Sequence, residues 1–430
     1  MTALPADTQW LQREDLQRLI AALGAKNARY VGGAVRDTLL GLAVRDIDIA
    51  TPHEPREVMR RLKAQGIKVI PTGIDHGTVT AILPGGAAEI TSLRRDVSTD
   101  GRRATVAFAQ DWQADAARRD FTINALYADP LTGEVFDWFG GLEDLEARTV
   151  RFIGDAEQRI REDHLRILRY FRFQARFGSQ PADADAENAC AALAATLKGL
   201  SRERVGMEIM NLLGLPDPAP TIARMAQLGV LQMVLPEADD RALKALVAEE
   251  VRQGIAPDPL RRMAALIPAD VPAAEQIASR FRLSGAQKKR LALAAGRIPP
   301  RRGEGDSPQD GGGAQASGPD PEKLRDPEGA PRPPSVVPLP QGGGMARALA
   351  YRLGRAAALD RLLLVGADTA PLNGWEIPTF PLKGGDIVAR GIQAGPDVSR
   401  LLKAVEARWV DEQFPDAARV SALLDAELGG

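Results

Sequence analysis

Two aspartates, Asp46 and Asp48, alternate with isoleucines in the segment RDIDIAT at residues 45–51. In a β-strand, residues two apart point to the same side, so Ile47 and Ile49 can face a core while both carboxylates face a cleft. Two like charges at close range repel unless a cation lies between them, and carboxylate oxygens suit magnesium. Most D-x-D pairs are solvated strand ends or turns, so this pair indicates a metal site only with support from other segments.

The segment before the aspartates has features of a phosphate-binding site. A predicted strand at Arg29–Val31 runs into Gly32 and Gly33 and then into a helix. Glycines let a ligand approach the backbone closely, and the free N–H groups at a helix start favour phosphate. Arg36 lies in the first helical turn, where a cation is unfavourable for the helix dipole unless an anion is near. Glycine pairs alone more often mark simple turns.

A third candidate site lies in REDHLRILR at residues 161–169. The spacing predicts that Asp163 and Arg166 share one face of a helix. Cytosine and adenine both carry an amino group beside an acceptor ring nitrogen, so a carboxylate can accept from the first and an arginine can donate to the second. Guanine and uracil present a carbonyl oxygen where the carboxylate needs a donor. The alternative is an ordinary intrahelical ion pair between Asp163 and Arg166.

Arginines recur at every third residue along the same predicted helix, at Arg166, Arg169 and Arg172. Guanidinium groups that face a cleft suit a triphosphate, because each can donate several hydrogen bonds to phosphate oxygens. The alternative is a solvated basic face. Candidate contacts to an RNA backbone, again with solvated helix faces as the alternative, are Arg202, Arg204, Lys288, Lys289 and Arg290.

Size and composition limit the class of protein. A chain of 430 residues is expected to form two to four domains, and 44% hydrophobic with 26% charged residues is typical of soluble globular proteins. The single cysteine, Cys190, allows no intrachain disulfide and favours a reducing compartment. We find no secretory signal and no membrane-length apolar run, so a cytoplasmic location is expected. With a net charge of −2, nucleic-acid binding requires a local basic surface.

The apolar pattern predicts an α+β fold. Up to about Phe152, short apolar runs alternate with turns, whereas the segment from Ala156 to about Arg297 is almost wholly helical, with Gly178 able to end the helix that carries Leu168 and Phe171. Predicted strands are Arg29–Val31, Ile47–Ala50, Lys68–Ile70, Thr78–Leu83, Glu89–Leu93 and Thr105–Ala109, and predicted early helices are Arg13–Leu23, Ala34–Leu40 and Pro55–Gln65.

The segment Pro299–Gly344 is rich in Gly, Pro, Ser, Asp and Arg and has no apolar periodicity. It cannot bury enough surface to offset its ordering entropy, which predicts a disordered linker, with an ordered loop as the alternative. Helices are expected to resume at Met345–Val365, with a last one at Ser399–Asp411. The predicted domains are a catalytic head at 1–152, a helical neck at 153–215, an RNA-binding body at 216–298, the linker at 299–344 and a helical tail at 345–430.

Together these segments resemble the nucleotidyltransferase superfamily of DNA polymerase β. Within it they resemble class II tRNA nucleotidyltransferases, which are CCA-adding enzymes, and the related bacterial poly(A) polymerases. Trp138 departs from the family pattern, because a proline is common there in the D-P-F-G-G hinge. The matching segments are GGAVRD at 32–37, RDIDIAT at 45–51, PTGIDHGTV at 71–79, EITSLRRD at 89–96, RRDFTINAL at 118–126, DWFGG at 137–141, REDHLRILR at 161–169, RFRLSGAQKKR at 280–290 and PLKGGDIVARGIQAGP at 381–396.

The resemblance implies a polymerase-β-like α/β head followed by an all-helical neck, body and tail. It implies template-independent transfer of CMP and AMP from CTP and ATP to the tRNA 3′ end by a two-metal mechanism with Mg²⁺. The alternative is a poly(A) polymerase or A-adding enzyme. CCA addition is favoured by the RDIDIAT sequence, by the short arm before Gly32 and by the lack of a strongly basic C-terminal tail. Intact Asp46, Asp48 and Arg119 argue against an inactive RNA-binding protein. No membrane and no stable protein partner are expected.

The same resemblance implies roles for individual residues. Asp46 and Asp48 match the magnesium ligands, and Glu89 matches a third catalytic carboxylate. Gly33 and Arg36 match residues that touch the triphosphate.

The remaining implied roles concern the sugar and the base. Arg119 and Asp120 match the residues that hold the ribose, and Asp163 and Arg166 match the pair that selects the incoming base. Further nucleotide contacts are matched by Arg169 and Arg172.

Deleting Gly303–Gln341 should leave CCA addition and thermal stability nearly unchanged, because this composition buries little surface. The entropy of closing a loop changes only slowly with its length. Melting temperature and tRNA 3′-end addition, compared between the full and shortened chains, check this expectation. A large drop in melting temperature would show that the segment packs against a folded part of the chain.

Overall fold

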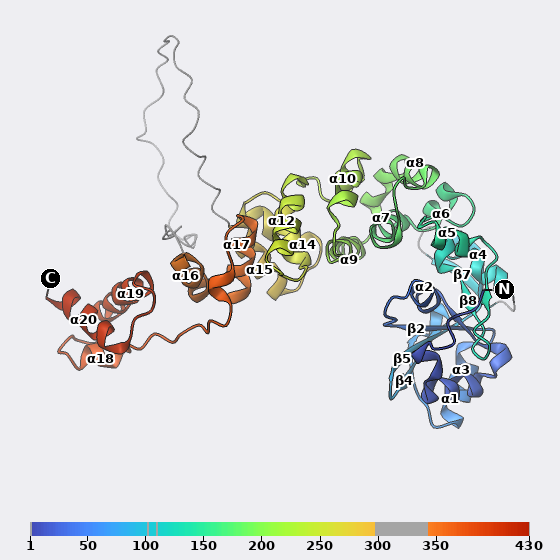
Figure 1. Cartoon of the computed structure of the whole chain (residues 1–430), viewed down its shortest axis with the longest axis horizontal. Coiled ribbons are helices and arrows are strands. Elements are labelled where there is room, and N and C mark those ends of the chain that lie inside the picture. The colour runs from blue at the N-terminus through green and yellow to red at the C-terminus, as the bar shows by residue number, and fades with distance from the viewer. Residues whose placement is uncertain (1, 101–102, 109–110, 297–342, 430) are drawn as a thin grey trace, which may run out of the picture. The chain divides into compact units, whose positions relative to one another are not determined.

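The computed structural model describes residues 2–100, 103–108, 111–296 and 343–429 (Figure 1). The predicted linker therefore lies outside the described residues, except that its last residues begin a helix. Contacts divide the chain into two compact units. The first comprises Met1–Val247, Pro257–Pro268 and Glu275–Lys288, and the second comprises Ala248–Ala256, Ala269–Ala274 and Lys289–Gly430.

The head is built on a seven-stranded sheet with the order β3-β4-β5-β2-β1-β8-β9. Strands β2 and β5 are parallel, and the other neighbours are antiparallel. Ile47 and Ile49 of β2 are buried while Asp48 between them is partly exposed, as the alternation predicts. The strands are β1 (Arg29–Val31), β2 (Ile47–Thr51), β3 (Lys68–Gly73), β4 (Thr78–Leu83), β5 (Gly86–Ser92), β8 (Tyr127–Ala128) and β9 (Val135–Phe136), with β6 (Arg94–Asp100) and β7 (Arg103–Phe108) forming a separate hairpin.

Two amphipathic helices, α1 and α3, pack together, and α3 lies against β3, β4 and β5 (Figure 1). Val58 and Leu62 of α3 are fully buried, four residues apart on one helix face. Helix α2 follows β1 directly and starts after Gly32, whose φ is +66°. The head helices are α1 (Glu14–Leu23), α2 (Gly33–Leu39), α3 (Pro55–Ala64), α4 (Trp112–Ala117) and α5 (Gly141–Glu146).

The chain after the head is helical, which confirms the α+β prediction. One detail of that prediction was wrong: the helix expected through Glu162, Asp163 and Arg166 is two helices. Asp163 has extended backbone angles and its carboxylate accepts the N–H of Leu165 at 3.1 Å, so the chain turns before α7 begins. The helices are α6 (Ala156–Glu162), α7 (Arg166–Phe177), α8 (Ala184–Ala192), α9 (Arg202–Leu213), α10 (Ala219–Gln227), α11 (Val230–Val234), α12 (Arg241–Arg252), α13 (Pro259–Leu266), α14 (Val271–Arg280) and α15 (Gly285–Ala295).

The C-terminal helices belong to the second unit. The helices predicted at Met345–Val365 are α16 and α17, and they are separated at Gly354, which adopts a φ of +83° that favours glycine. The helix predicted as the last one is followed by another, and both pack around the buried ring of Trp409. These helices are α16 (Gly343–Leu353), α17 (Arg355–Leu364), α18 (Gly384–Val388), α19 (Pro396–Asp411) and α20 (Ala417–Leu428).

A buried arginine caps the C-terminal end of α9. Arg262 of α13 is 1% exposed, and its guanidinium donates to the carbonyl oxygens of Leu213 (2.8 Å), Leu215 and Pro216 (3.0 Å). Backbone carbonyls at a helix end lack intrahelical partners, so this side chain satisfies acceptors that burial would otherwise leave unpaired.

Replacing Arg262 with leucine should lower the free energy of unfolding by about 3 kcal/mol, because one buried and two partly buried carbonyl contacts are lost. Urea unfolding followed by circular dichroism measures the change. Arg241→Leu is the matched control, since Arg241 is exposed and forms an ion pair with its sequence neighbour Asp239, and it should leave the unfolding curve nearly unchanged. Equal unfolding curves for both variants would contradict a capping role for Arg262.

Candidate active site

A cavity of about 390 Å³ opens between the central strands β2 and β5 of the head sheet and helices α7 and α9. Its lining is dominated by charged side chains of both signs. The carboxylates that line it are Asp48, Glu89, Asp115, Asp120 and Asp163. The arginines that line it are Arg94, Arg118, Arg119, Arg166, Arg169 and Arg204.

The structure thus brings together most of the residues that the sequence predicted for the site. Those that line the cavity are Asp48, Glu89, Arg119, Asp120, Asp163, Arg166 and Arg169. The predicted residues that do not line it are Gly33, Arg36, Asp46 and Arg172.

One side of the cavity is acidic. Asp48 on β2 pairs in register with Glu89 on the parallel strand β5. Burial, followed by the charge of Glu89, raises the pKa of Asp48 to about 6, although Arg119 acts in the opposite direction. Asp46 lies one residue before β2, is exposed, and adds a smaller effect in the same direction as Glu89.

The carboxylate oxygens of Asp48 and Glu89 on this acidic side are suitable ligands for a divalent cation. The carboxylates of Asp48 and Glu89 each raise the free energy of the other's charged form, and a cation between them would remove that cost. Among the described residues, no three His, Cys, Asp or Glu side chains are gathered as a closed metal centre. An open arrangement of one or two carboxylates suits Mg²⁺, which in nucleotide sites also takes ligands from phosphates and water.

Arg36 is predicted to contact the triphosphate, but its side chain does not line the cavity in this structure. Its side chain is 5% exposed, and it donates to Asp37 at 2.8 Å and to the amide oxygen of Asn124. Its guanidinium lies 4.1 Å from the centre of the Phe177 ring on α7, and burial lowers the pKa of Arg36. Gly33 lies beside this arginine in α2. A phosphate contact by Arg36 requires its guanidinium to leave Asn124, so that role stays a prediction.

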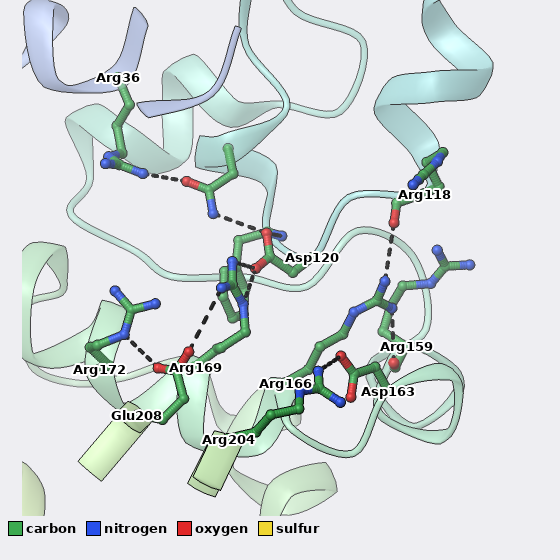
Figure 2. A network of polar contacts seen from close by, with 12 residues as sticks. Arg36, Arg118, Asp120, Arg159, Asp163, Arg166, Arg169, Arg172, Arg204 and Glu208 are labelled. Atoms are coloured by element: carbon green, nitrogen blue, oxygen red, sulfur yellow. Dashed lines mark hydrogen bonds and ion pairs between the residues drawn. The ribbon is translucent and has the colours of Figure 1, made fainter. Parts of the chain in front are cut away.

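A chain of polar contacts joins the head to α7 and α9 (Figure 2). Asn124 donates to Asp120 at 2.9 Å, and Arg169 donates to the other carboxylate oxygen of Asp120 at 2.8 and 2.5 Å. Burial favours the neutral acid, but Arg169 and Asn124 outweigh it and hold the pKa of Asp120 below its usual range. Arg172 points to Glu208 of α9, with a nitrogen–oxygen distance of 2.6 Å, which explains why it does not line the cavity.

The predicted base-selecting pair faces the cavity, but its two members are not paired with each other. Asp163 accepts a hydrogen bond at 2.8 Å from Arg204 of α9, a residue that the sequence suggested only as an RNA-backbone contact (Figure 2). Arg166 donates to Glu162 at 2.6 Å and to the backbone carbonyl of Arg118 at 3.1 Å. The intrahelical Asp163–Arg166 ion pair, considered as the alternative, is therefore wrong.

Sequence reasoning missed several residues of this site. Asp115 lines the cavity from the short helix α4, and Glu208 and Arg204 reach the site from α9. Arg204 and Glu208 are four residues apart and so share a helix face, which is the one sequence signal that linked them. Asn124 lies inside the segment RRDFTINAL, but its two amide contacts depend on the fold.

Comparisons with known proteins find family models, relatives and solved structures similar to this chain. The model of the poly(A) polymerase head domain matches residues 28–151, and that of the probable RNA- and SrmB-binding site of polymerase A matches residues 183–241. The Bacillus stearothermophilus CCA-adding enzyme in complex with CTP has a similar fold, with a TM-score of 0.66 at 24% identity, covering 97% of this chain and 99% of that one. The Thermotoga maritima CCA-adding enzyme complexed with tRNA-CCA gives a TM-score of 0.66 at 19% identity, covering both chains fully.

A mouse (Mus musculus) protein named CCA tRNA nucleotidyltransferase 1, mitochondrial, is 32% identical over 419 residues, which is 93% of this chain and 87% of the mouse protein. Its name assigns that relative to mitochondria, so the cytoplasmic location expected for this chain stays a prediction. Within the described residues, no helix is both long and apolar enough to cross a membrane. With similarity to the mouse protein along nearly its whole length, the chain belongs to the family of CCA tRNA nucleotidyltransferases.

Proposed function

We propose that the charged cavity binds the incoming nucleotide while this enzyme transfers CMP and AMP from CTP and ATP to the 3′ end of tRNA. The proposal rests on the observation that one cavity is lined both by the carboxylates Asp48 and Glu89 and by the predicted base-selecting residues Asp163 and Arg166. A nucleoside triphosphate needs both features, because its phosphates require cations and its base requires fixed donors and acceptors.

Asp46 and Asp48 are proposed to hold Mg²⁺, with Glu89 as a third carboxylate. When bound, the metal ions would activate the tRNA 3′-hydroxyl and stabilise the charge of the departing pyrophosphate. Glu89 lies in register with Asp48, so its carboxylate can orient a shared ligand from the adjacent strand. Asp46 is exposed before β2 and needs to turn toward the same side to join them.

The sugar and phosphates are proposed to lie along Arg119, Asp120 and Arg169. Asp120 is held in its charged form by Arg169 and already accepts from Phe121, Asn124 and Arg169, so its contact with a ribose hydroxyl requires one of these hydrogen bonds to be exchanged. Arg169 remains 33% exposed beside the cavity and can donate to a phosphate while still paired with Asp120.

Base selection is proposed to rest on Asp163 as acceptor and Arg166 as donor. Contacts with Glu162 and with the carbonyl of Arg118 hold the Arg166 guanidinium in one orientation. A guanidinium carries five N–H donors, so further donors remain for the ring nitrogen of cytosine or adenine. Arg204 holds the Asp163 carboxylate from the opposite element, α9.

The test of the activity is incubation with tRNA that lacks CCA, supplied with CTP alone, ATP alone, or both, followed by sequencing of the 3′ ends. Addition of CCA from the mixture supports the proposal. Long adenosine tails from ATP alone would instead identify a poly(A) polymerase, and a single adenosine added only to tRNA ending in CC would identify an A-adding enzyme. Domain boundaries at 152, 215 and 298 stay proposals that limited proteolysis checks.

Asp48→Ala should abolish transfer while the protein stays folded, because the reacting phosphoryl group loses a metal ligand. We expect a loss of at least about 10³-fold, which corresponds to roughly 4 kcal/mol of barrier, and a similar loss for Asp46→Ala. Single-turnover rates measure the effect. Asp48→Asn keeps the shape and removes the charge, so it should be nearly as inactive. Turnover within tenfold of wild type would remove the residue from the metal site.

Asp163→Ala should reduce discrimination against UTP and GTP by about ten- to a hundredfold, because the base amino group loses its acceptor. Arg166→Ala should weaken CTP and ATP together, since both use the same donor. The measurement is kcat/KM for each of the four triphosphates. Arg176→Ala, on the same helix α7 but outside the cavity, is the control and should leave the ratios unchanged. Unchanged ratios in all three variants would place base selection elsewhere.

A further inference from the structure

Asp115 is a buried carboxylate that lines the cavity and contacts several of its arginines. Its side chain is 5% exposed. One oxygen accepts the hydroxyl of Tyr127 at 2.6 Å and lies 3.5 Å from a terminal nitrogen of Arg119. The other accepts the backbone N–H of Arg94 at 3.1 Å and lies 3.7 Å from Nε of Arg118. One carboxylate thus links the start of the β6–β7 hairpin to the consecutive arginines of the cavity.

Tyr127 of β8 transmits this contact. Its hydroxyl donates to Asp115 and accepts from Nε of Arg119 at 3.0 Å, so it lies between the carboxylate of Asp115 and the guanidinium of Arg119. Burial raises the pKa of Tyr127, which keeps the hydroxyl proton available for donation. The ring is fixed by edge-to-face packing against Trp112 and against Trp138 of the DWFGG segment, with centroid distances of 6.1 and 5.5 Å.

These contacts orient the guanidinium of Arg119. Its Nε and one terminal nitrogen are engaged by Tyr127 and Asp115, which leaves the other terminal nitrogen, Nη1, on the side of Gly32. A Cβ atom at Gly32 would lie 3.4 Å from that nitrogen, which is an ordinary van der Waals distance, so Nη1 borders the glycine turn at the start of α2. Asp48, across the cavity, adds an attractive charge from the acidic side.

We propose that Asp115 and Tyr127 are positioning residues that fix Arg119 for contact with the incoming nucleotide. The proposal rests on the nucleotide-binding role proposed for Arg119 above. Without the Asp115 charge, Arg118 and Arg119 would repel each other, and the Arg119 side chain would lose the acceptors that fix its orientation. Groups held in place before substrate arrives lower the barrier more than mobile ones, because no ordering is left to do during the reaction.

Tyr127→Phe tests this directly, since it keeps the ring and removes only the hydroxyl. It should lower kcat/KM for CTP about tenfold or more. Asp115→Asn should give a comparable loss. Tyr30→Phe is the matched control, because Tyr30 is equally buried in the neighbouring strand β1 and packs against Trp10 away from the cavity; it should leave kcat/KM unchanged.

A double-mutant cycle separates positioning from general stability. If Tyr127 acts through Arg119, then Tyr127→Phe should cost less than about twofold once Arg119→Ala is present. Full additivity of the two losses, or wild-type kcat/KM in Tyr127→Phe alone, would overturn the proposal.

A second readout needs no catalysis. Phenylglyoxal labels free guanidinium groups, and peptide mass spectrometry locates the label. Tyr127→Phe should speed labelling of Arg119 severalfold while Arg204, which pairs with Asp163, reacts as in wild type. Unchanged labelling of Arg119 would overturn the proposal. A wild-type protein that adds no nucleotide to tRNA would refute the proposed function instead, and the labelling comparison would still decide whether Tyr127 holds Arg119.

Discussion

The carboxylate of Asp120 accepts two hydrogen bonds from Arg169 at 2.8 and 2.5 Å, and this ion pair joins the α/β head to helix α7. Asp120 is 8% exposed, so the pair lies largely out of water, where an unpartnered charge is costly. The cavity depends on this ion pair, because Asp48 and Glu89 belong to the head while Asp163 and Arg166 belong to the helical part. Asn124 contacts both Asp120 and Arg36 of α2, and Arg169 of α7 also lies near Glu208 of α9. Helices α2, α7 and α9 are therefore linked through the contacts of Asp120.

The positive and negative side chains of the cavity nearly balance in number. The chain as a whole carries a formal charge of −2, yet the cavity collects six arginines against five carboxylates. Several of these arginines already donate to a carboxylate or a backbone carbonyl, as Arg166 does to Glu162 and Arg118. A guanidinium with five donors can keep such a contact and still bind a ligand, which a lysine could do less well because its charge is not fixed in a plane. Fixed arginines therefore stabilise the fold and, in the proposed function, keep donors for the nucleotide.

Much of the fold could be predicted from local patterns. The predicted strands Arg29–Val31 and Thr78–Leu83 match β1 and β4 residue for residue, because clear turn residues bound both. Strands β8 and β9 were missed because each has two residues, too few to show alternation. The helix break at Asp163 was missed because no Gly or Pro marks it within the segment REDHLRILR at 161–169, while the side chain's preference for capping a backbone N–H favoured the extended conformation there.

Most of the predicted residues line the cavity, but others such as Asp115 were missed and the contacts inside the cavity could not be predicted. Arg204 reaches Asp163 across 41 positions of sequence, and Glu208 reaches Arg172 across 36. No periodicity within one helix encodes partners at such separations, so a local ion pair was the natural alternative. The burial of Arg36 against Phe177 is likewise a product of how α2 packs on α7, and the glycine–helix pattern around it gave no sign of that neighbour.

The two contacts of the Asp163 carboxylate determine how many hydrogen bonds it can still accept. An ionised carboxylate offers about four acceptor positions. Arg204 occupies one on the first oxygen and the N–H of Leu165 occupies one on the second, so the group is pinned at both ends and cannot rotate freely. About half of its accepting capacity is left open, and none of its atoms can donate. In the proposed function, a nucleobase would therefore meet a fixed set of vacant acceptors, and a base edge with a carbonyl oxygen in that place would find no hydrogen to receive.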